Sequence, residues 1–422
     1  MESVTVNGRA YRLPARPVVV VCIDGSAPEY FDDGLRRGTL PRLARFRRAG
    51  FSALADCVIP SFTNPNNLSI VTGAPPAVHG ISGNFFLDPD TGRETMMNDP
   101  ALLRCDSVLA ALARRGLRIA IVTAKDKLRL LLGHGVQPAP PDPRASTRHA
   151  VCFSAERAHD TSLAEHGIAH ADEFVGRPAP DVYSAAASEF VMEAGVKLLE
   201  TWRPDVMYLS LTDYIQHKHP PGDRAADAFY RRLDALWGRL AELGAVVGLT
   251  ADHGMNGKTR ADGQPDIVYL EPLLAQCLPA GGFRVILPIT DPYVVHHGSL
   301  GSYATVYLRD GGTVSRAREL LARERGIVYV EPRAAACERF GLPPDRVGDL
   351  VVISDRHVVL GKSPAAHDLS LLKEPLRSHG GLAEQRVPFE VSAPVSAAYR
   401  ERARQGLRNF DIFDYVLNGV TP

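Results

Sequence analysis

Four short segments of the chain are almost entirely apolar and rich in β-branched residues, without the regular polar alternation of a half-exposed strand. They are Val18–Ile23, Arg118–Thr123, Val206–Leu211 and Ala245–Thr250. Continuous apolar runs of this length are typical of strands that are buried on both faces of a parallel sheet. We therefore predict that these four segments form the centre of one sheet.

Two of the connecting segments carry apolar residues at helical spacing. One covers Ser184–Thr201, and the other covers Ala225–Leu243, where Phe229, Leu233 and Leu240 recur with a period of about 3.6 residues. Their apolar stripes should cover the sheet. The alternation of strands and helices predicts an α/β fold with a mainly parallel sheet flanked by helices.

The pattern changes between residues 257 and 348, where short strands are predicted at Arg284–Leu287 and Tyr303–Leu308 and a helix at Ser315–Arg323. We interpret residues 257–348 as an inserted α+β cap domain, and residues 1–256 with 349–422 as the core. The apolar run Leu350–Ile353 is then expected to rejoin the core sheet. Residues 138–180 have little periodicity and predict a long excursion over the surface.

The charge pattern indicates a small-molecule substrate. Lys plus Arg equals Asp plus Glu at 48 each, and no block of like charges suggests a partner that is a nucleic acid or a membrane surface. The first residues resemble no targeting segment, and the six cysteines are scattered singly. We expect a soluble cytoplasmic protein; its oligomeric state stays open, a homodimer included.

Three of the four predicted strands are followed by an aspartate. Asp24 follows the first, Asp213 the third and Asp252 the fourth. Because the carboxyl ends of parallel strands lie at one edge of the sheet, these carboxylates should converge and repel one another. A single aspartate at such a position is more often a turn or cap residue, but three together favour a cation site.

Histidines accompany these aspartates. His217 lies four residues after Asp213, His253 follows Asp252 directly, and His379 lies in the glycine-flanked motif SHGG. Nitrogen and oxygen donors without thiolates suit two zinc ions, with manganese or iron as alternatives. Such a site would be catalytic.

Thr63 is the candidate nucleophile. It precedes Asn64-Pro65 and an apolar helix start, and a helix N-terminus stabilises an anion. A threonine hydroxyl needs such a group, a metal ion or both to react at neutral pH. Simple N-capping is the alternative role of this residue.

Together, Asp24-Gly25, TNPN from Thr63, TGAPPAVHGISGNFF, Asp213 with His217, TADHGM and SHGG resemble the nucleotide pyrophosphatase/phosphodiesterase branch of the alkaline phosphatase superfamily. The resemblance implies an alkaline-phosphatase-like core. It implies that Asp24, Thr63, Asp252 and His253 hold one ion, and that Asp213, His217 and His379 hold the other. It also implies that Asn84 donates to a phosphoryl oxygen of the substrate.

Lys125 and Lys127 follow the second predicted strand and should point towards the same edge as the aspartates. Two ammonium groups there favour a substrate with a second negative group, such as a carboxylate, whereas a solvated turn compensated by Asp126 is the alternative. The segment TAKDKLRLLLGHG and the cap resemble the members of the superfamily that hydrolyse phosphonoacetate. On that resemblance Lys125 and Lys127 bind the carboxylate and Arg284 assists them.

The expected reaction is hydrolysis of the C–P bond of phosphonoacetate to acetate and phosphate, through Thr63 and a phosphothreonine intermediate. A phosphodiesterase or phosphomonoesterase with the same two metals is the alternative enzyme. A metal-binding protein without catalysis is the alternative from another class. The sequence assigns no role to His134, His296 or His297.

Overall fold

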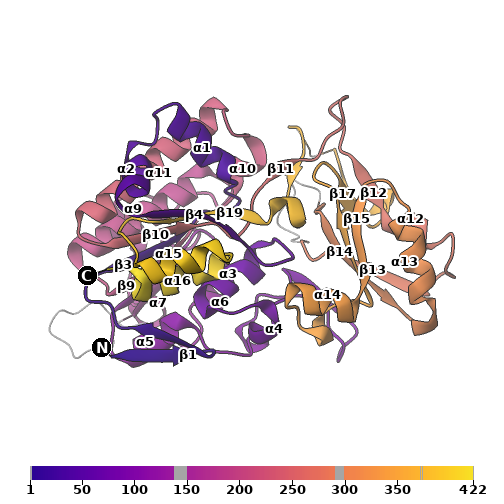
Figure 1. Ribbon diagram of the computed structural model, residues 1–422, viewed down its shortest axis with the longest axis horizontal. Helices are drawn as coiled ribbons and strands as arrows, with labels where there is room; N and C mark the ends of the chain where they lie inside the picture. The colour runs from indigo at the N-terminus through magenta and orange to yellow at the C-terminus, as the bar shows by residue number, and fades with distance from the viewer. Residues whose placement is uncertain (1, 137–149, 290–298, 371, 373, 422) are drawn as a thin grey trace.

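The computed structural model describes residues 2–136, 150–289, 299–370, 372 and 374–421. Within these residues, a seven-stranded sheet forms the centre of the larger part of the molecule (Figure 1). Its strands, in spatial order, are β4 (Phe51–Asp56), β19 (Arg386–Val391), β10 (Val246–Thr250), β3 (Val18–Cys22), β9 (Val206–Ser210), β7 (Ile119–Thr123) and β8 (Ala150–Ser154). The four strands predicted from the sequence are therefore adjacent.

The strands from β10 to β8 run parallel, and their last residues are in register. Thr250 pairs with Cys22, Cys22 with Ser210, and Ser210 with Thr123. The residue that follows each strand therefore lies along one edge of the sheet. β19 runs antiparallel to β10, and β4 antiparallel to β19, so the sheet is mainly parallel as predicted.

Helices cover both faces of this sheet because alternate side chains of β3 enter two different cores. Val19 and Val21 pack with the helices α1 (Pro28–Arg36), α2 (Pro41–Ala49), α9 (Ala185–Thr201) and α11 (Arg224–Glu242). Val18 and Val20 pack with α3 (Thr63–Thr72), α5 (Val108–Arg114), α6 (Asp126–Leu132) and α16 (Ile412–Asp414). The two predicted helices are confirmed as α9 and α11.

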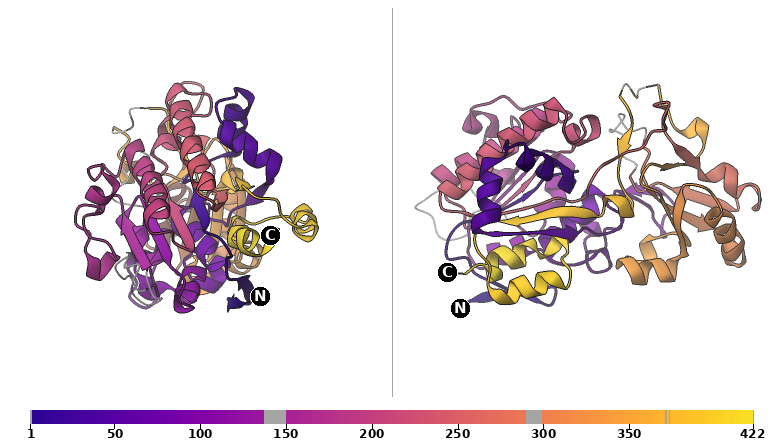
Figure 2. Two further views of the ribbon diagram at one scale, coloured as in Figure 1. Left: turned by 90° about the vertical axis from the view of Figure 1, so that its left-hand side faces the viewer. Right: turned by 45° about the horizontal axis from the view of Figure 1, so that its top comes forward.

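A second, antiparallel sheet lies at one end of the molecule (Figures 1 and 2). Its four strands in the described chain, in spatial order, are β13 (Phe283–Ile286), β14 (Tyr303–Leu308), β16 (Leu350–Ser354) and β15 (Ile327–Pro332). The helix α13 (Val314–Ala322) packs against β15. The expectation that Leu350–Ile353 rejoins the core sheet is wrong, because this run pairs with β14 and β15 in the second sheet.

The expected surface excursion between residues 138 and 180 is also wrong in part. Residues 150–154 form the edge strand β8, which pairs with β7, and short helices α7 (Leu163–His166) and α8 (Ala171–Val175) follow. Residues 137–149 lie outside the described residues. Residues 150–154 therefore belong to the core, next to β7, the strand that Lys125 follows.

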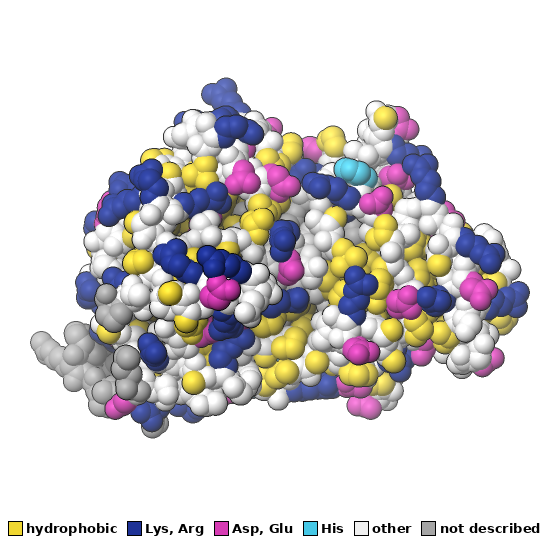
Figure 3. Space-filling model, viewed as in Figure 1, with side chains coloured by type: hydrophobic (Ala, Val, Ile, Leu, Met, Phe, Trp, Pro, Cys, Tyr) yellow, Lys and Arg dark blue, Asp and Glu magenta, His cyan; other side chains and the backbone are white. Residues whose placement is uncertain are grey.

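Shorter elements complete the two parts. The strands are β1 (Ser3–Val6), β2 (Arg9–Arg12), β5 (Phe85–Leu87), β6 (Glu94–Met96), β11 (Asn256–Gly257), β12 (Ile267–Tyr269), β17 (Val359–Gly361) and β18 (Arg377–Ser378). The helices are α4 (Pro76–His79), α10 (Tyr214–Lys218), α12 (Leu270–Leu274), α14 (Arg333–Phe340) and α15 (Ala397–Arg404). Among the described residues, every helix is too short or too polar to cross a bilayer. On the face drawn in Figure 3, basic and acidic side chains are interspersed.

Candidate active site

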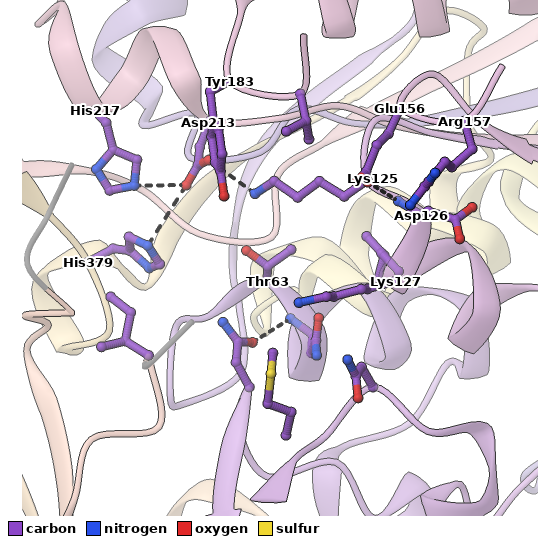
Figure 4. Close-up of a pocket in the computed structure, with 17 residues that line it drawn as sticks. Thr63, Lys125, Asp126, Lys127, Glu156, Arg157, Tyr183, Asp213, His217 and His379 are labelled. Carbon is purple, nitrogen blue, oxygen red and sulfur yellow. Dashed lines mark hydrogen bonds and ion pairs between the residues drawn. The ribbon is translucent and has the colours of Figure 1, made fainter. Parts of the chain in front are cut away.

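The edge where the parallel strands end carries the predicted acidic residues. Asp24 lies just beyond β3, Asp213 just beyond β9 and Asp252 just beyond β10, and all three are buried. The register of these strands brings the carboxylates together, as the sequence predicts. Lys125 follows β7 at the same edge, and Figure 4 shows its side chain extending towards Asp213.

One group of potential metal donors consists of Asp213, His217 and His379. The Nε2 atom of His217 lies 3.0 Å from Oδ2 of Asp213, and Nε2 of His379 lies 4.0 Å from the same oxygen. His217 comes from α10, one helical turn after Asp213, whereas His379 follows β18 near the other end of the chain. The fold therefore joins residues that are far apart in the sequence.

A second group consists of Asp24, Asp213 and His253. Nε2 of His253 lies 3.3 Å from Oδ1 of Asp24 and 3.7 Å from Oδ2 of Asp252. Asp213 thus belongs to both groups and lies between them. The rings of His253 and His379 stack with centroids 3.6 Å apart, so the two groups adjoin.

The backbone orients all three histidines in the same way. Nδ1 of His217 bonds to the carbonyl of Arg377 at 2.9 Å, and Nδ1 of His379 bonds to that of Ser61 at 2.8 Å. Nδ1 of His253 bonds to the carbonyl of Gly254 at 2.9 Å. A carbonyl only accepts, so each Nδ1 carries a proton, and in the neutral form of each ring Nε2 would present its lone pair to the carboxylates. This is the arrangement that a histidine ligand of a metal requires.

The electrostatics of the site also fit cations. Burial, with the nearby charges of Asp213 and Asp252, raises the pKa of Asp24 to about 8. Both oxygens of Asp24 and Nε2 of His253 are buried and accept or donate no hydrogen bond within the described residues. Against the effect of burial, Asp252 and Asp24 raise the pKa of His253 to about 9. Divalent cations would compensate these crowded carboxylates.

Thr63 lies at the start of α3 and lines the same cavity as Asp213, His217 and His379. The N-cap residue of α3 is Phe62, so Thr63 is not the capping residue of this helix. The side-chain oxygen of Asn84 accepts a hydrogen bond from the backbone N–H of Asn64 at 3.1 Å. This bond leaves the Asn84 amide nitrogen, which is a donor, for a ligand in the cavity.

The cavity has a volume of about 330 Å³ and contains further residues that the sequence reasoning missed. Lys125 and Lys127 line it, together with Glu156, Arg157 and Tyr183 (Figure 4). The Glu156 carboxylate accepts a hydrogen bond from the backbone N–H of Asp126 at 2.8 Å, which fixes the turn between the two lysines. Glu156 was missed because β8, the strand that it follows, was not predicted.

A model of the type I phosphodiesterase/nucleotide pyrophosphatase family matches residues 18–382. The chain belongs to this family. The matched range spans the positions of the seven predicted metal ligands, which are Asp24, Thr63, Asp213, His217, Asp252, His253 and His379. The chain is accordingly a hydrolase.

Among solved structures, the chain is similar to phosphonoacetate hydrolase from Sinorhizobium meliloti 1021. That enzyme, solved in complexes with phosphonoformate and with phosphonoacetate, is 51% identical over 100% of this chain and 99% of its own, with a TM-score of 0.93. Human ectonucleotide pyrophosphatase/phosphodiesterase 5 is 15% identical over 96% of each chain, with a TM-score of 0.62. This second likeness shows the fold alone and confirms the predicted α/β core of the phosphodiesterase family.

Curated relatives match over a shorter segment. An uncharacterized pyrophosphatase/phosphodiesterase of Schizosaccharomyces pombe is 38% identical over 86 residues, which are 20% of this chain and 16% of the yeast protein. An ectonucleotide pyrophosphatase/phosphodiesterase of Caenorhabditis elegans is 39% identical over 77 residues, 18% of this chain and 10% of that protein. These matches thus span a small part of the relatives' length.

Two other residues named from the sequence, Arg284 and His134, are not among the described residues that line the cavity. Arg284 on β13 is exposed, donates to the carbonyl of Gly92 at 3.2 Å and does not line the cavity in the described structure. His134 is exposed beyond the end of α6. His296 and His297 lie outside the described residues.

Proposed function

We propose that this phosphodiesterase-family hydrolase cleaves the C–P bond of phosphonoacetate and releases acetate and phosphate. The observation that carries the proposal is the likeness over the full chain, at 51% identity, to a phosphonoacetate hydrolase whose structure holds phosphonoacetate. The cavity supports it because two lysines line the same space as Thr63 and the donor group of Asp213, His217 and His379. The phosphonate group of the substrate would thus face the proposed metal ions, and its carboxylate would face the two lysines.

We assign Asp24, Thr63, Asp252 and His253 to one zinc ion, and Asp213, His217 and His379 to the other. Three imidazoles with Nε2 directed at buried carboxylates support this set of donors. Oxygen and nitrogen ligands would also accept manganese or iron. When bound, two such ions would lower the pKa of the Thr63 hydroxyl and neutralise charge on the phosphoryl oxygens.

In the proposed reaction the Thr63 oxygen forms a bond to phosphorus while the P–C bond breaks. The electron pair of that bond passes to the carbon and its carboxylate, which Lys125 and Lys127 stabilise as an enediolate. The Thr63 hydroxyl releases its proton as the O–P bond forms, and the carbon takes up one proton to give acetate, so the step balances. Water next attacks the phosphothreonine, and phosphate leaves with regeneration of the Thr63 hydroxyl. The Asn84 amide nitrogen donates to a phosphoryl oxygen throughout.

Phosphodiester or phosphomonoester hydrolysis at the same residues is the second candidate function. Family membership favours it, and the cavity also has apolar walls, formed by Met96, Val182 and Ile289, that would accept an alcohol or nucleoside group. A diester has no carboxylate for Lys125 and Lys127, so these lysines favour phosphonoacetate. A metal-binding protein without catalysis is the third reading of the same donors.

The test is a comparison of kcat/KM for phosphonoacetate and for an aryl phosphodiester with the zinc-loaded protein. We expect phosphonoacetate to be the better substrate by at least about a hundredfold, as several directed charge-assisted bonds would give. A protein that cleaves the diester and leaves phosphonoacetate intact would be a phosphodiesterase. A protein that binds zinc and cleaves neither compound would support the binding-protein alternative.

A further inference from the structure

Asn67 lies one helical turn after Thr63 on α3 and is completely buried. Its amide nitrogen donates to the carbonyl of Thr63 at 3.1 Å and to Oδ2 of Asp252 at 3.3 Å. Its amide oxygen accepts from the hydroxyl of Tyr208 at 2.7 Å and from that of Ser210 at 3.0 Å. A carboxamide has two donor protons and two acceptor lone pairs, so this side chain uses all four.

These partners determine which way the amide faces. The Thr63 carbonyl accepts hydrogen bonds, as does a carboxylate oxygen of Asp252, so a flipped amide would place oxygen against oxygen at both contacts. The hydroxyls of Tyr208 and Ser210 can donate to the amide oxygen, and both lie on one face of β9 because they are two residues apart. The amide nitrogen is therefore held against Asp252.

Both carboxylate oxygens of Asp252 accept hydrogen bonds. Oδ1 accepts hydrogen bonds from the backbone N–H groups of Gly25 at 3.1 Å and His253 at 3.0 Å. Oδ2, which accepts from Asn67, is also the oxygen that lies 3.7 Å from Nε2 of His253. The bond from Asn67 therefore sets the rotation of the carboxylate and the direction of the second lone pair of Oδ2.

We propose that Asn67 is a positioning residue for the metal ion on the nucleophile side. It orients Asp252 as a ligand and holds the first turn of α3, which carries Thr63, against that ligand. The inference rests on the proposed dinuclear centre. Hydrogen-bond partners of ligands commonly change metal affinity or activity by about 10- to 100-fold. Among the described residues, no hydrogen bond joins Asn67 to Asp213, His217 or His379, so their ion should be unaffected.

The experiment compares two variants that differ at residue 67 alone. The background is Tyr208→Phe with Ser210→Ala, which removes the hydroxyls that would otherwise lose their acceptor, and Asn67→Leu is then added. Zinc per chain is measured by elemental analysis at a series of buffered free-zinc concentrations, with the thermal unfolding midpoint measured in parallel. Ser69→Ala is the control for general loss of stability, because Ser69 on the same helix bonds to His79 at 2.9 Å instead.

We expect the addition of Asn67→Leu to weaken one of the two zinc ions by about 10- to 100-fold and to leave the other unchanged. Turnover should fall at low zinc and recover in part at high zinc. Equal titrations with and without Asn67→Leu would overturn the inference while leaving the dinuclear centre intact, and so would parallel loss of both ions with the unfolding midpoint. Fewer than two zinc ions in the unmutated chain would overturn the dinuclear centre and this inference together.

Discussion

The Nζ atom of Lys125 lies 3.5 Å from Oδ1 of Asp213, so a cation at the end of β7 pairs with a carboxylate at the end of the neighbouring strand β9. Lys125 and His217 hold the pKa of Asp213 well below its usual range, even though burial acts in the opposite direction. Asp213 also belongs to both groups of metal donors. We therefore expect Lys125 to act on the proposed metal centre as well as on the substrate, whereas Lys127 extends towards Thr63 (Figure 4).

Alanine variants of the two lysines should therefore differ in their effects. Lys127→Ala should lower kcat/KM for phosphonoacetate by about 10- to 100-fold, because a charge-assisted contact to the carboxylate is lost, and should spare an aryl phosphodiester. Lys125→Ala should show the same preference and also change zinc affinity. Equal losses on both substrates for both variants would assign the lysines a general electrostatic role.

Thr63→Ala removes the proposed nucleophile, which is also a proposed ligand of one of the two ions. We expect turnover of phosphonoacetate to fall by at least about a thousandfold, because water alone must then attack phosphorus. Thr63→Ser, which restores a hydroxyl, should retain a measurable part of the activity. Elemental analysis should show that both variants retain the zinc ion assigned to His217 and His379. Undiminished turnover by the alanine variant would remove Thr63 from the mechanism.

His379→Ala tests the set of ligands. It removes one of the two imidazoles whose Nε2 lies within 4.0 Å of Oδ2 of Asp213, so zinc should fall from about two ions per chain to about one. His134→Ala is the matched control, since this histidine is exposed and outside the donor groups of the described chain. The same zinc content in both variants would contradict the assignment.

The buried His79 should contribute to the pH dependence of the protein's stability. Its side chain bonds to Ser69 on α3. Burial lowers the pKa of His79 to about 3, and its Nδ1 accepts from the backbone N–H of Ile81 at 3.1 Å. In the unfolded chain His79 takes up a proton near pH 6.5, whereas in the folded chain it stays neutral down to a much lower pH. The contribution of His79 to the free energy of unfolding is therefore fully present above pH 6.5 and declines as the pH falls, by up to about 1.4 kcal/mol per pH unit.

His79→Gln should therefore flatten the loss of the thermal midpoint between pH 6.5 and pH 5.5, measured with zinc present in both proteins. The unmutated chain should be the more pH-sensitive of the two. Parallel curves would show that His79 is protonated in the folded chain or contributes no proton uptake.

The sequence predicts the centre of the fold well because its signal is local. Continuous apolar runs are found where a strand is buried on both faces, and the in-register ends of parallel strands then bring Asp24, Asp213 and Asp252 to one edge. His217 and His253 follow because they are close to these aspartates in the chain. His379 is different, since only the resemblance carried by SHGG links it to the site.

What the sequence could not show depends on contacts between distant segments. The run Leu350–Ser354 is as apolar as the core strands, and nothing local indicates that it pairs in the second sheet. The strand β8 was hidden by the proline-rich residues before it, and with it the contact of Glu156 to Asp126. The four bonds of Asn67 reach two other elements of the core, so its role required the structure.

The most direct measurement is product release from phosphonoacetate by the purified zinc-loaded protein, with a chelated sample in parallel. The account predicts phosphate and acetate in equal amounts, formed with zinc and not after chelation. No phosphate from phosphonoacetate, in a protein shown to hold two zinc ions, would contradict the proposed C–P hydrolysis.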